Sequence, residues 1–271
     1  MADRIRITSI SNQIIKEVRS LSSKKGRTAA QAILLEGYRL VKDALNSGAI
    51  IRYFIISDNF FQKEELFLSQ MSNIKAVQVP DALFSRISKT ESPQGILAVA
   101  EMPVYNNKEI YERVKRIIAL ENIQDPGNLG TIIRSADACG FDAVLLSKDS
   151  ADPYNPKVIR ATMGSMFHIP VIIEEDFSQA LFKLKSKNIL LAAAHIRDAL
   201  PCWQADMSEK VAIIIGNEGN GLSDNVLELA DINVMIPMPG NAESFNASAA
   251  ASILIYECMR QKKEKEKNKI F

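Results

Sequence analysis

The 271-residue chain lacks the features that define several classes of protein. Its three cysteines, Cys139, Cys202 and Cys258, form an odd set without a CxxC pair, which argues against a disulfide framework and against a zinc site. No apolar run approaches the roughly 20 residues that span a bilayer, and the N-terminal sequence has no secretory apolar core. We therefore predict a cytoplasmic protein that has no membrane segment and binds no metal.

The net charge of +1 conceals a basic N-terminal segment. The first 50 residues carry nine lysines and arginines against four acidic residues. Such an excess is expected of a surface that binds phosphates, although a merely solvated basic face has the same composition. The candidates for phosphate contacts are Lys24, Lys25, Arg27 and Arg39.

The first hundred residues have the pattern of a small mixed α/β domain. In chain order we expect helix Ser11–Leu21, a Gly-containing basic turn Ser22–Arg27, strand Ala32–Leu35, helix Arg39–Ser47, strand Ile50–Ile56, a helix near Lys63–Met71 and strand Gly95–Ala100. The polar segment Pro103–Glu112 is the predicted linker, which places a domain boundary near Val104.

From Ile117 onward, short apolar runs alternate with helical stretches. Runs that are apolar throughout are typical of strands buried in a parallel sheet, and the alternation indicates an α/β fold. The predicted strands are Ile117–Leu120, Ala143–Leu146, Val171–Ile173, Ile189–Ala194, Val211–Ile215 and Val234–Ile236. Because ligands of such sheets bind beyond the carboxyl ends of the strands, the loops that follow these runs are the candidate site.

The first unusual loop continues into a helix and reads ENIQDPGNLGTIIRSADACGF, residues 121–141. After a Pro-Gly turn, Asn128 is predicted to cap the helix and Gly140 to end it. The apolar residues of this helix form one stripe, and Arg134 lies away from its centre. Arg134 is therefore either a solvated arginine or a charge aimed at a phosphate or a reacting group.

The second loop, residues 216–224, reads GNEGNGLSD. Its glycines permit positive φ and let backbone amides approach a ligand, and Ser223 is predicted to cap the next helix. The loop lacks the ending of a phosphate-binding P-loop, and its GxxGxG order is not the Rossmann fingerprint. An acid between glycines is unusual in a simple turn, which favours a functional role for Glu218.

The third loop lies in IPMPGNAESFNASAAASILIYECMRQ, residues 236–261. Two prolines and a glycine predict an irregular turn, and the small residues that follow predict a helix packed closely on its own sheet. Asn246 is either the cap of this helix or a functional side chain.

These three segments resemble the signature motifs of the SpoU/TrmH family of RNA 2′-O-ribose methyltransferases, within the SPOUT superfamily. NxxDPGNLGTIIRSADACGF, IIGNEGNGLS and IPMPGNAESFNASAAASILIYE occur in the order and approximate spacing of that family. ATMGSMFHIPV at 161–171 resembles the segment between the first two motifs. The resemblance covers residues 115–261, and residues 1–100 resemble the family's substrate-binding domain more weakly.

The resemblance implies a particular architecture. Residues 104–271 would form a SpoU-type methyltransferase domain, a parallel-sheet SPOUT fold with a C-terminal trefoil knot. Residues 1–103 would form a mixed α/β domain that binds the RNA substrate, for which the four basic residues named above are the candidates. The family also implies a homodimer and S-adenosyl-L-methionine as the methyl donor.

Four positions match the functional side chains of the family: Asn128 and Arg134 in the first motif, Glu218 in the second and Asn246 in the third. The expected cofactor contacts lie in the loops at the strand ends: Ala194, His195, Gly216, Asn217, Gly219, Gly221, Ile236, Met238 and Phe245. Family members commonly have leucine at position 245; a backbone contact would survive the change to phenylalanine, but the wall of the pocket could differ. From the residues alone, His195 either lines the adenosine pocket or lies in a surface loop.

Methyl transfer from a sulfonium to a hydroxyl requires positioning and removal of the hydroxyl proton, and it needs no metal. A guanidinium keeps its proton above pH 12, so Arg134 is better suited to bind the adjacent phosphate and stabilise alkoxide charge, with Glu218 or Asn246 orienting it. The separate basic domain favours 23S ribosomal RNA as the substrate. A tRNA ribose and a non-catalytic RNA-binding role remain the alternatives, and the glycine order disfavours a dinucleotide-dependent enzyme.

Overall fold

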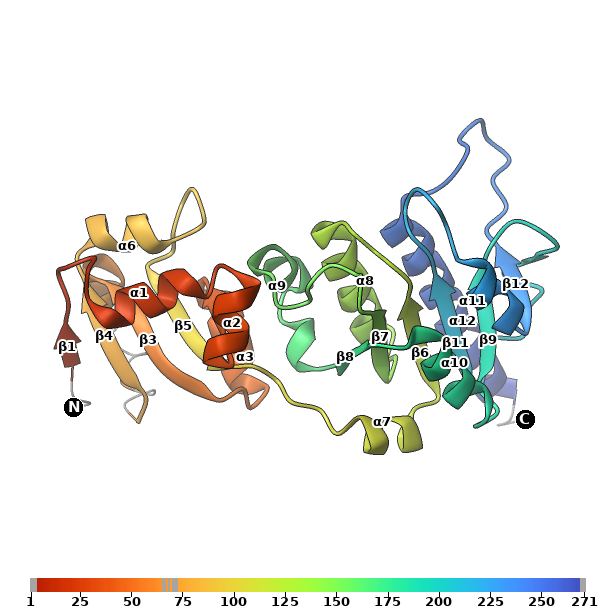
Figure 1. The fold of residues 1–271 in the computed structure, drawn as a ribbon, viewed down its shortest axis with the longest axis horizontal. Helices are drawn as coiled ribbons and strands as arrows, with labels where there is room; N and C mark the ends of the chain where they lie inside the picture. The colour runs from red at the N-terminus through yellow and green to blue at the C-terminus, as the bar shows by residue number, and fades with distance from the viewer. Residues whose placement is uncertain (1–3, 65–66, 68, 70–72, 269–271) are drawn as a thin grey trace. The chain divides into compact units, whose positions relative to one another are not determined.

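The computed structural model describes residues 4–64, 67, 69 and 73–268, which form two compact units (Figure 1). The first unit consists of Met1–Val104 and Tyr154–Phe167, and the second of Tyr105–Pro153 and His168–Phe271. The units divide near the expected boundary, but the segment Tyr154–Phe167 packs with the first unit although it follows two strands of the second. The assignment of a separate function to each region stays a prediction.

Within its described residues, the first unit is built on a five-stranded mixed sheet. The order across the sheet is β1 (Arg4–Arg6), β4 (Lys75–Val79), β3 (Ile51–Ser57), β5 (Ile96–Glu101) and β2 (Ala32–Glu36). The strands β1, β4 and β3 run parallel to one another, and β5 is antiparallel to both β3 and β2. The carboxyl ends of β3 and β4 therefore lie at one edge, together with the start of β5.

Alternation along these strands sends side chains to two hydrophobic cores. In β2, Ala32 and Leu34 contribute to one core, and Ile33 and Leu35 contribute to the other. The first core is covered by α1 (Gln13–Ser20) and α6 (Asp81–Ile87). The second is covered by α3 (Tyr38–Asn46), α4 (Asp58–Lys63), α9 (Pro156–Thr162) and the 3-10 helix η1 (Ser165–Phe167).

The predicted helices at 11–21 and 39–47 and the strands at 32–35, 50–56 and 95–100 are confirmed. The predicted turn at 22–27 is wrong, because α2 (Lys24–Ala30) begins there with Ser23 as its cap. Gly26 inside this helix marks a close approach, since a Cβ at that position would lie 2.0 Å from the Ser20 carbonyl oxygen. The helix predicted near 63–71 lies largely outside the described residues, and β1, β4 and α6 were not predicted from the apolar spacing.

The second unit contains a seven-stranded sheet in its described residues, and every pairing in it is parallel. The order is β10 (Leu200–Pro201), β12 (Ile232–Met235), β9 (Leu190–Ala194), β11 (Val211–Ile215), β6 (Arg116–Leu120), β7 (Ala143–Ser147) and β8 (Val171–Glu174). The six predicted strands are confirmed, and the short edge strand β10 was missed. The α/β fold class is likewise confirmed.

Helices cover both faces of this parallel sheet. On one face α10 (Phe177–Lys185) and α11 (Asp224–Leu229) bury their apolar residues against alternate strand residues. On the other, α8 (Pro126–Ala138) packs against β7, and α12 (Ala247–Asn268) packs against both α8 and β11. No helix among the described residues is long and apolar enough to cross a bilayer.

The predicted linker 103–112 is not irregular throughout. It contains α7 (Asn107–Arg113), which Asn106 caps through its side chain. Ile110 and Tyr111 pack against the core of the second unit, and the Tyr111 hydroxyl donates to Glu174 at 3.0 Å. The pKa of Tyr111 is raised, mainly by partial burial of its hydroxyl and to a smaller extent by the charge of Glu174. The chain that follows Val104 is therefore attached to the second unit.

Gly95 provides a test of the first unit. Its φ is +84°, and a Cβ there would lie 2.7 Å from Ser57 Oγ and 2.8 Å from Phe60 Cβ. We expect Gly95→Ala to lower the free energy of unfolding by about 2–4 kcal/mol, combining the left-handed backbone and the overlap, measured by urea denaturation. Gly48→Ala is the control, because Gly48 has φ +79° and open space. Equal losses in the two variants would contradict the role of the close approach.

Candidate active site

The three loops singled out in the sequence follow parallel strands of the same sheet, β6, β11 and β12. The strands β12, β9, β11 and β6 lie side by side and run parallel, so their carboxyl ends meet at one edge. The loop after β6 begins at Glu121, the loop after β11 at Gly216 and the loop after β12 at Ile236. The strand order therefore brings together three segments that are far apart in the sequence.

Glu218 joins the loop after β11 to the loop after β6. Its carboxylate accepts the side-chain amide of Asn128 at 3.0 Å and the backbone N–H groups of Gln124 and Asp125, both at 3.3 Å. Partial burial disfavours the ionised carboxylate, but the hydrogen bonds from Asn128, from its own backbone and from Gln124 and Asp125 together outweigh it. The pKa of Glu218 therefore lies below its ordinary value.

Glu121 makes a second bridge between the same loops. This carboxylate is 8% exposed and accepts both the backbone N–H of Ser223 at 2.8 Å and its hydroxyl at 2.6 Å. Ser223 in turn caps α11, as predicted. Glu121 was not predicted from the sequence, because an acid at the end of an apolar strand gives no sign of its partner about a hundred residues later.

The loop after β11 is a closed turn. Asn217 and Gly221 exchange two backbone hydrogen bonds, and the Asn217 side-chain oxygen accepts the N–H groups of Gly219 and Asn220. These N–H groups are used inside the loop and are therefore not available to cradle a ligand, and a cofactor contact through other atoms of Asn217, Gly219 and Gly221 stays a prediction. Gly216 is required for another reason: a Cβ there would lie 2.3 Å from the carbonyl carbon of Gly221.

The cap of α8 is Asp125 rather than Asn128. The Asp125 side chain accepts the Asn128 N–H at 2.8 Å, and Pro126 follows it in the first turn. Asp-Pro is a recognisable start of a helix, because proline tolerates the first helical position. This arrangement leaves the Asn128 side chain available to Glu218. Gly140, at φ +66° just beyond the helix, fulfils the predicted end.

Within the described residues, the other two candidate side chains form no hydrogen bond to Asn128 or Glu218. Arg134 is exposed on α8, and within the described residues it has no hydrogen-bond or ion-pair partner. Asn246 caps α12, accepting the N–H and the hydroxyl of Ser248 at 2.9 and 2.6 Å. Neither Glu218 nor Asn246 orients Arg134 in this structure, and the catalytic role of all four side chains stays a prediction.

The third loop has the donors that the second loop lacks. In the part of the chain that the structure describes, the backbone N–H groups of Ile236, Met238 and Phe245 form no hydrogen bond. Ile236 and Met238 are half-buried, and Phe245 is 43% exposed. Free amides beside apolar side chains suit a ligand with a flat base and polar edges. The residues therefore fit an adenosine-containing cofactor.

His195 follows Ala194 at the end of β9, on the same edge of the sheet. Its N–H donates to the Val234 carbonyl, and its Nδ1 accepts the N–H of Arg197 at 3.1 Å. A neutral imidazole with Nδ1 engaged as an acceptor carries its proton on Nε2. His195 is therefore a donor at its outer nitrogen, and the loop that contains it lies beside the third loop.

The structure divides the basic residues of the first unit. Lys24, Lys25 and Arg39 are exposed. Arg27 is 3% exposed and its Nη1 donates to the Leu21 carbonyl at 2.9 Å. The expectation that Arg27 contacts RNA is therefore wrong, because its guanidinium is used to hold the connection between α1 and α2.

Comparison with known families decides the assignment. The model of the SpoU rRNA methylase family matches residues 115–256, more than half of the chain, and includes all three loops. The protein belongs to the SpoU rRNA methylase family. A model described as the MRM3-like substrate binding domain matches residues 12–98. The resemblance read from the three motifs is confirmed, and as a SpoU methylase the protein is an enzyme.

Relatives of this SpoU methylase match along almost its full length. The 23S rRNA (guanosine(2553)-2′-O)-methyltransferase RlmP of Bacillus subtilis is 36% identical over 93% of this chain and 98% of its own. The rRNA methyltransferase of Sinorhizobium meliloti, solved with AdoMet bound, is 30% identical, covers 95% of this chain and 98% of its own, and superposes with a TM-score of 0.84. The SpoU methyltransferase AviRb of Streptomyces viridochromogenes, solved with AdoMet, is 28% identical over 92% of this chain and 98% of its own, with a TM-score of 0.83.

From the hydrogen bond between Asn128 and Glu218 we predict that the stability of the fold depends on the ionisation of Glu218. Because the fold holds the pKa of Glu218 below its ordinary value, this carboxylate adds stability above the unfolded pKa and loses it as the pH falls through the folded pKa. Asn128→Ala removes a donor, so we expect the titration midpoint of Glu218 to rise, measured by carboxyl NMR. The control is Asn220→Ala in the same exposed turn. An unchanged midpoint in Asn128→Ala would show that the backbone donors alone hold the pKa of Glu218 below its ordinary value.

Proposed function

We propose that the protein transfers the methyl group of S-adenosylmethionine to the 2′-hydroxyl of a ribose in 23S ribosomal RNA. The observation that carries this proposal is the match of three strand-end loops, at the carboxyl ends of parallel strands in one sheet, to the SpoU rRNA methylase family. The names of the relatives support the ribosomal substrate, and the AdoMet-bound neighbours support the methyl donor.

The donor would be held at the carboxyl edge of β9, β11 and β12. When bound, it supplies the electrophilic methyl group. The free amides of Ile236, Met238 and Phe245 would meet the polar edges of its adenosine, and Nε2–H of His195 would add a donor. Gly216 allows the turn after β11 to fold tightly, so that this loop leaves room for the ligand.

Arg134 is suited to bind the RNA phosphate next to the reacting ribose. Its guanidinium is exposed and unpaired within the described residues, and it stays charged at any physiological pH. A charge placed there stabilises the oxyanion that develops as the hydroxyl loses its proton. Glu218 is a weak base because its pKa is lowered, so its role is to hold Asn128 and the two loops in place.

Substitution of Arg134 tests this role. We expect Arg134→Ala to reduce kcat by about 10²–10³-fold and Arg134→Lys by about tenfold, with the affinity for S-adenosylmethionine unchanged. Labelled donor and unmodified 23S rRNA give the turnover, and calorimetry gives the affinity. Thr131→Ala, one turn earlier on the exposed face of α8, is the control. Near wild-type turnover in Arg134→Lys would contradict a need for planar, bidentate contact.

The same assay tests the substrate. Unmodified 23S rRNA and tRNA are incubated with labelled donor, and the modified ribose is mapped by mass spectrometry. The expected product is a 2′-O-methyl nucleotide in 23S rRNA. Label in tRNA alone would favour the tRNA alternative. RNA binding without any affinity for S-adenosylmethionine would indicate a non-catalytic RNA-binding protein.

The proposal includes a homodimer, a trefoil knot in the C-terminal segment and a cytoplasmic location, as the family implies. An apolar face on α12 supports the dimer: Ile253 is 36% exposed and Tyr256 is 57% exposed, three residues apart on one side of the helix. The opposite side of α12 is buried through Leu254, Ile255 and Cys258. A second copy of the chain would cover the exposed side.

Tyr256→Glu tests this surface. We expect the variant to sediment as a monomer where the wild type is a dimer, because a carboxylate at a contact between two copies is desolvated and faces its symmetric equivalent. Phe182→Glu is the control, since Phe182 is 62% exposed on α10, away from α12. If both variants remain dimers, the contact lies elsewhere.

A further inference from the structure

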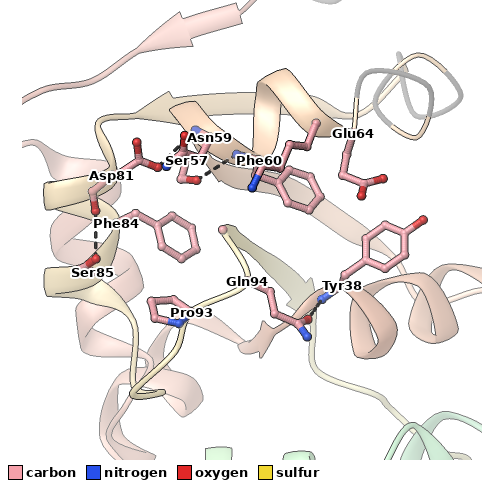
Figure 2. Close-up of a pocket in the computed structure, with 12 residues that line it drawn as sticks. Tyr38, Ser57, Asn59, Phe60, Glu64, Asp81, Phe84, Ser85, Pro93 and Gln94 are labelled. Atoms are coloured by element: carbon pink, nitrogen blue, oxygen red, sulfur yellow. Dashed lines mark hydrogen bonds between the residues drawn. The ribbon is translucent and has the colours of Figure 1, made fainter.

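The first unit contains a cavity of about 560 Å³ at the carboxyl ends of β3 and β4. Three aromatic side chains, Tyr38, Phe60 and Phe84, form its walls, as Figure 2 shows. The volume is in the range of small-molecule sites, and aromatic walls suit a flat ring. Ser57, the last residue of β3, lies at the cavity and caps α4.

A second cavity of about 580 Å³ adjoins the first, because Gln94 lines both. It lies at the beginning of α3, where the cap residue Gly37 has φ +106° and provides no side-chain hydrogen bond. Arg39 from α3 and Arg160 from α9 line it. The Nη1 atom of Arg160 is buried and has no hydrogen-bond partner among the described residues.

Several hydrogen-bond donors in the two cavities are unpaired, whereas some of the acids are already bonded. Within the described residues, the side-chain amide of Asn59, the ammonium of Lys63 and the guanidinium of Arg39 have no hydrogen-bond partner. Two of the acids are engaged: Glu36 accepts Ser88, Thr90 and the Lys89 N–H, and Asp81 accepts the Asn59 N–H, whereas the carboxylate of Glu64 has no hydrogen-bond partner among the described residues. The cavities therefore offer unpaired donors to a ligand that brings acceptors.

Gln94 fixes the junction between the cavities. Its Oε1 accepts the Tyr38 N–H at 2.7 Å, which is the first amide of α3 and has no partner within the helix. This bond sets the orientation of the side-chain amide and leaves Nε2 as a donor without a hydrogen-bond partner in the described part of the chain. Figure 2 shows Gln94 below the ring of Phe60 and beside Tyr38.

We propose that these adjoining cavities take up one unpaired nucleotide of the RNA substrate. The base lies among Tyr38, Phe60 and Phe84, with Asn59 and Gln94 as donors to its edge. The phosphate lies beside Arg39 and Arg160 near the N-terminus of α3, whose first amide is already bonded to Gln94 and whose backbone dipoles favour an anion. Proteins read RNA sequence chiefly from unstacked bases held in this way. This assignment rests on the proposed function, because it names how the RNA substrate is recognised.

Gln94→Glu is the sharpest test, since the variant keeps the shape of the side chain and the oxygen that accepts the Tyr38 N–H. It replaces the donor Nε2 by a charged oxygen between the two cavities. We expect the affinity of the full-length protein for an RNA hairpin with an unpaired loop to fall by about 5–150-fold, the equivalent of one lost stacked or hydrogen-bonded base. Fluorescence anisotropy without any methyl donor gives the affinity.

A second pair of variants distinguishes a direct contact between Arg39 and a phosphate from the effect of positive charge anywhere on the surface. Arg39→Ala is expected to weaken hairpin binding and to reduce the salt slope by about one unit. Arg19→Ala, an exposed arginine of α1 outside both cavities, is the matched control and should change the affinity much less. For a fully paired duplex of equal length, the affinities of Gln94→Glu and of the wild type should differ far less than they do for the hairpin.

The inference is overturned if Gln94→Glu, folded as judged by circular dichroism, binds the hairpin as tightly as the wild type. It is also overturned if Arg19→Ala loses as much affinity as Arg39→Ala. Because the binding assay contains no methyl donor, these outcomes are independent of methyl transfer. Failure of the proposed function would be seen separately, as intact hairpin binding without any labelled product.

Discussion

The pairing of two carboxylates with donors from a second loop is the constraint on which the site depends. Glu121 holds Ser223, and Glu218 holds Asn128 together with the backbone of the loop after β6. Neither bridge would form unless β6 and β11 were neighbours, and the parallel order of the sheet makes them so. The Gly-rich turn is thus anchored at both ends, and the free backbone amides of the described site residues lie in the third loop.

Much of the second unit was predictable from the sequence, because strands buried on both faces leave continuous apolar runs. Ile117–Leu120 and Val211–Ile215 are such runs, and both were placed correctly. The first unit was harder. The strand β1 is three residues long and carries Arg4 and Arg6, and helix α2 contains Gly26, so local composition argued against both elements. Their conformation is decided by tertiary contacts that no local pattern contains.

The candidate site likewise has features that the sequence predicts and others that it does not. Motifs located the loops, and strand order brought them together, but the partners of single atoms were not predictable. Asn128 was expected to cap α8, and Asp125 does so instead. Arg27 was counted with the basic surface and is buried. In each case the residue type allowed two roles, and the choice depends on a neighbour that only the folded chain supplies.

The first unit is completed by a segment that follows part of the second unit in the sequence. Ile159 and Met166 belong to its core, beside Ile33 and Phe54, yet they are separated from residue 104 by two strands and two helices of the second unit. During synthesis this core stays unfinished until residue 167 has left the ribosome. A fragment that stops at Val104 exposes apolar surface that α9 and η1 cover in the full chain. The two units are therefore interdependent products of one folding process, not interchangeable modules.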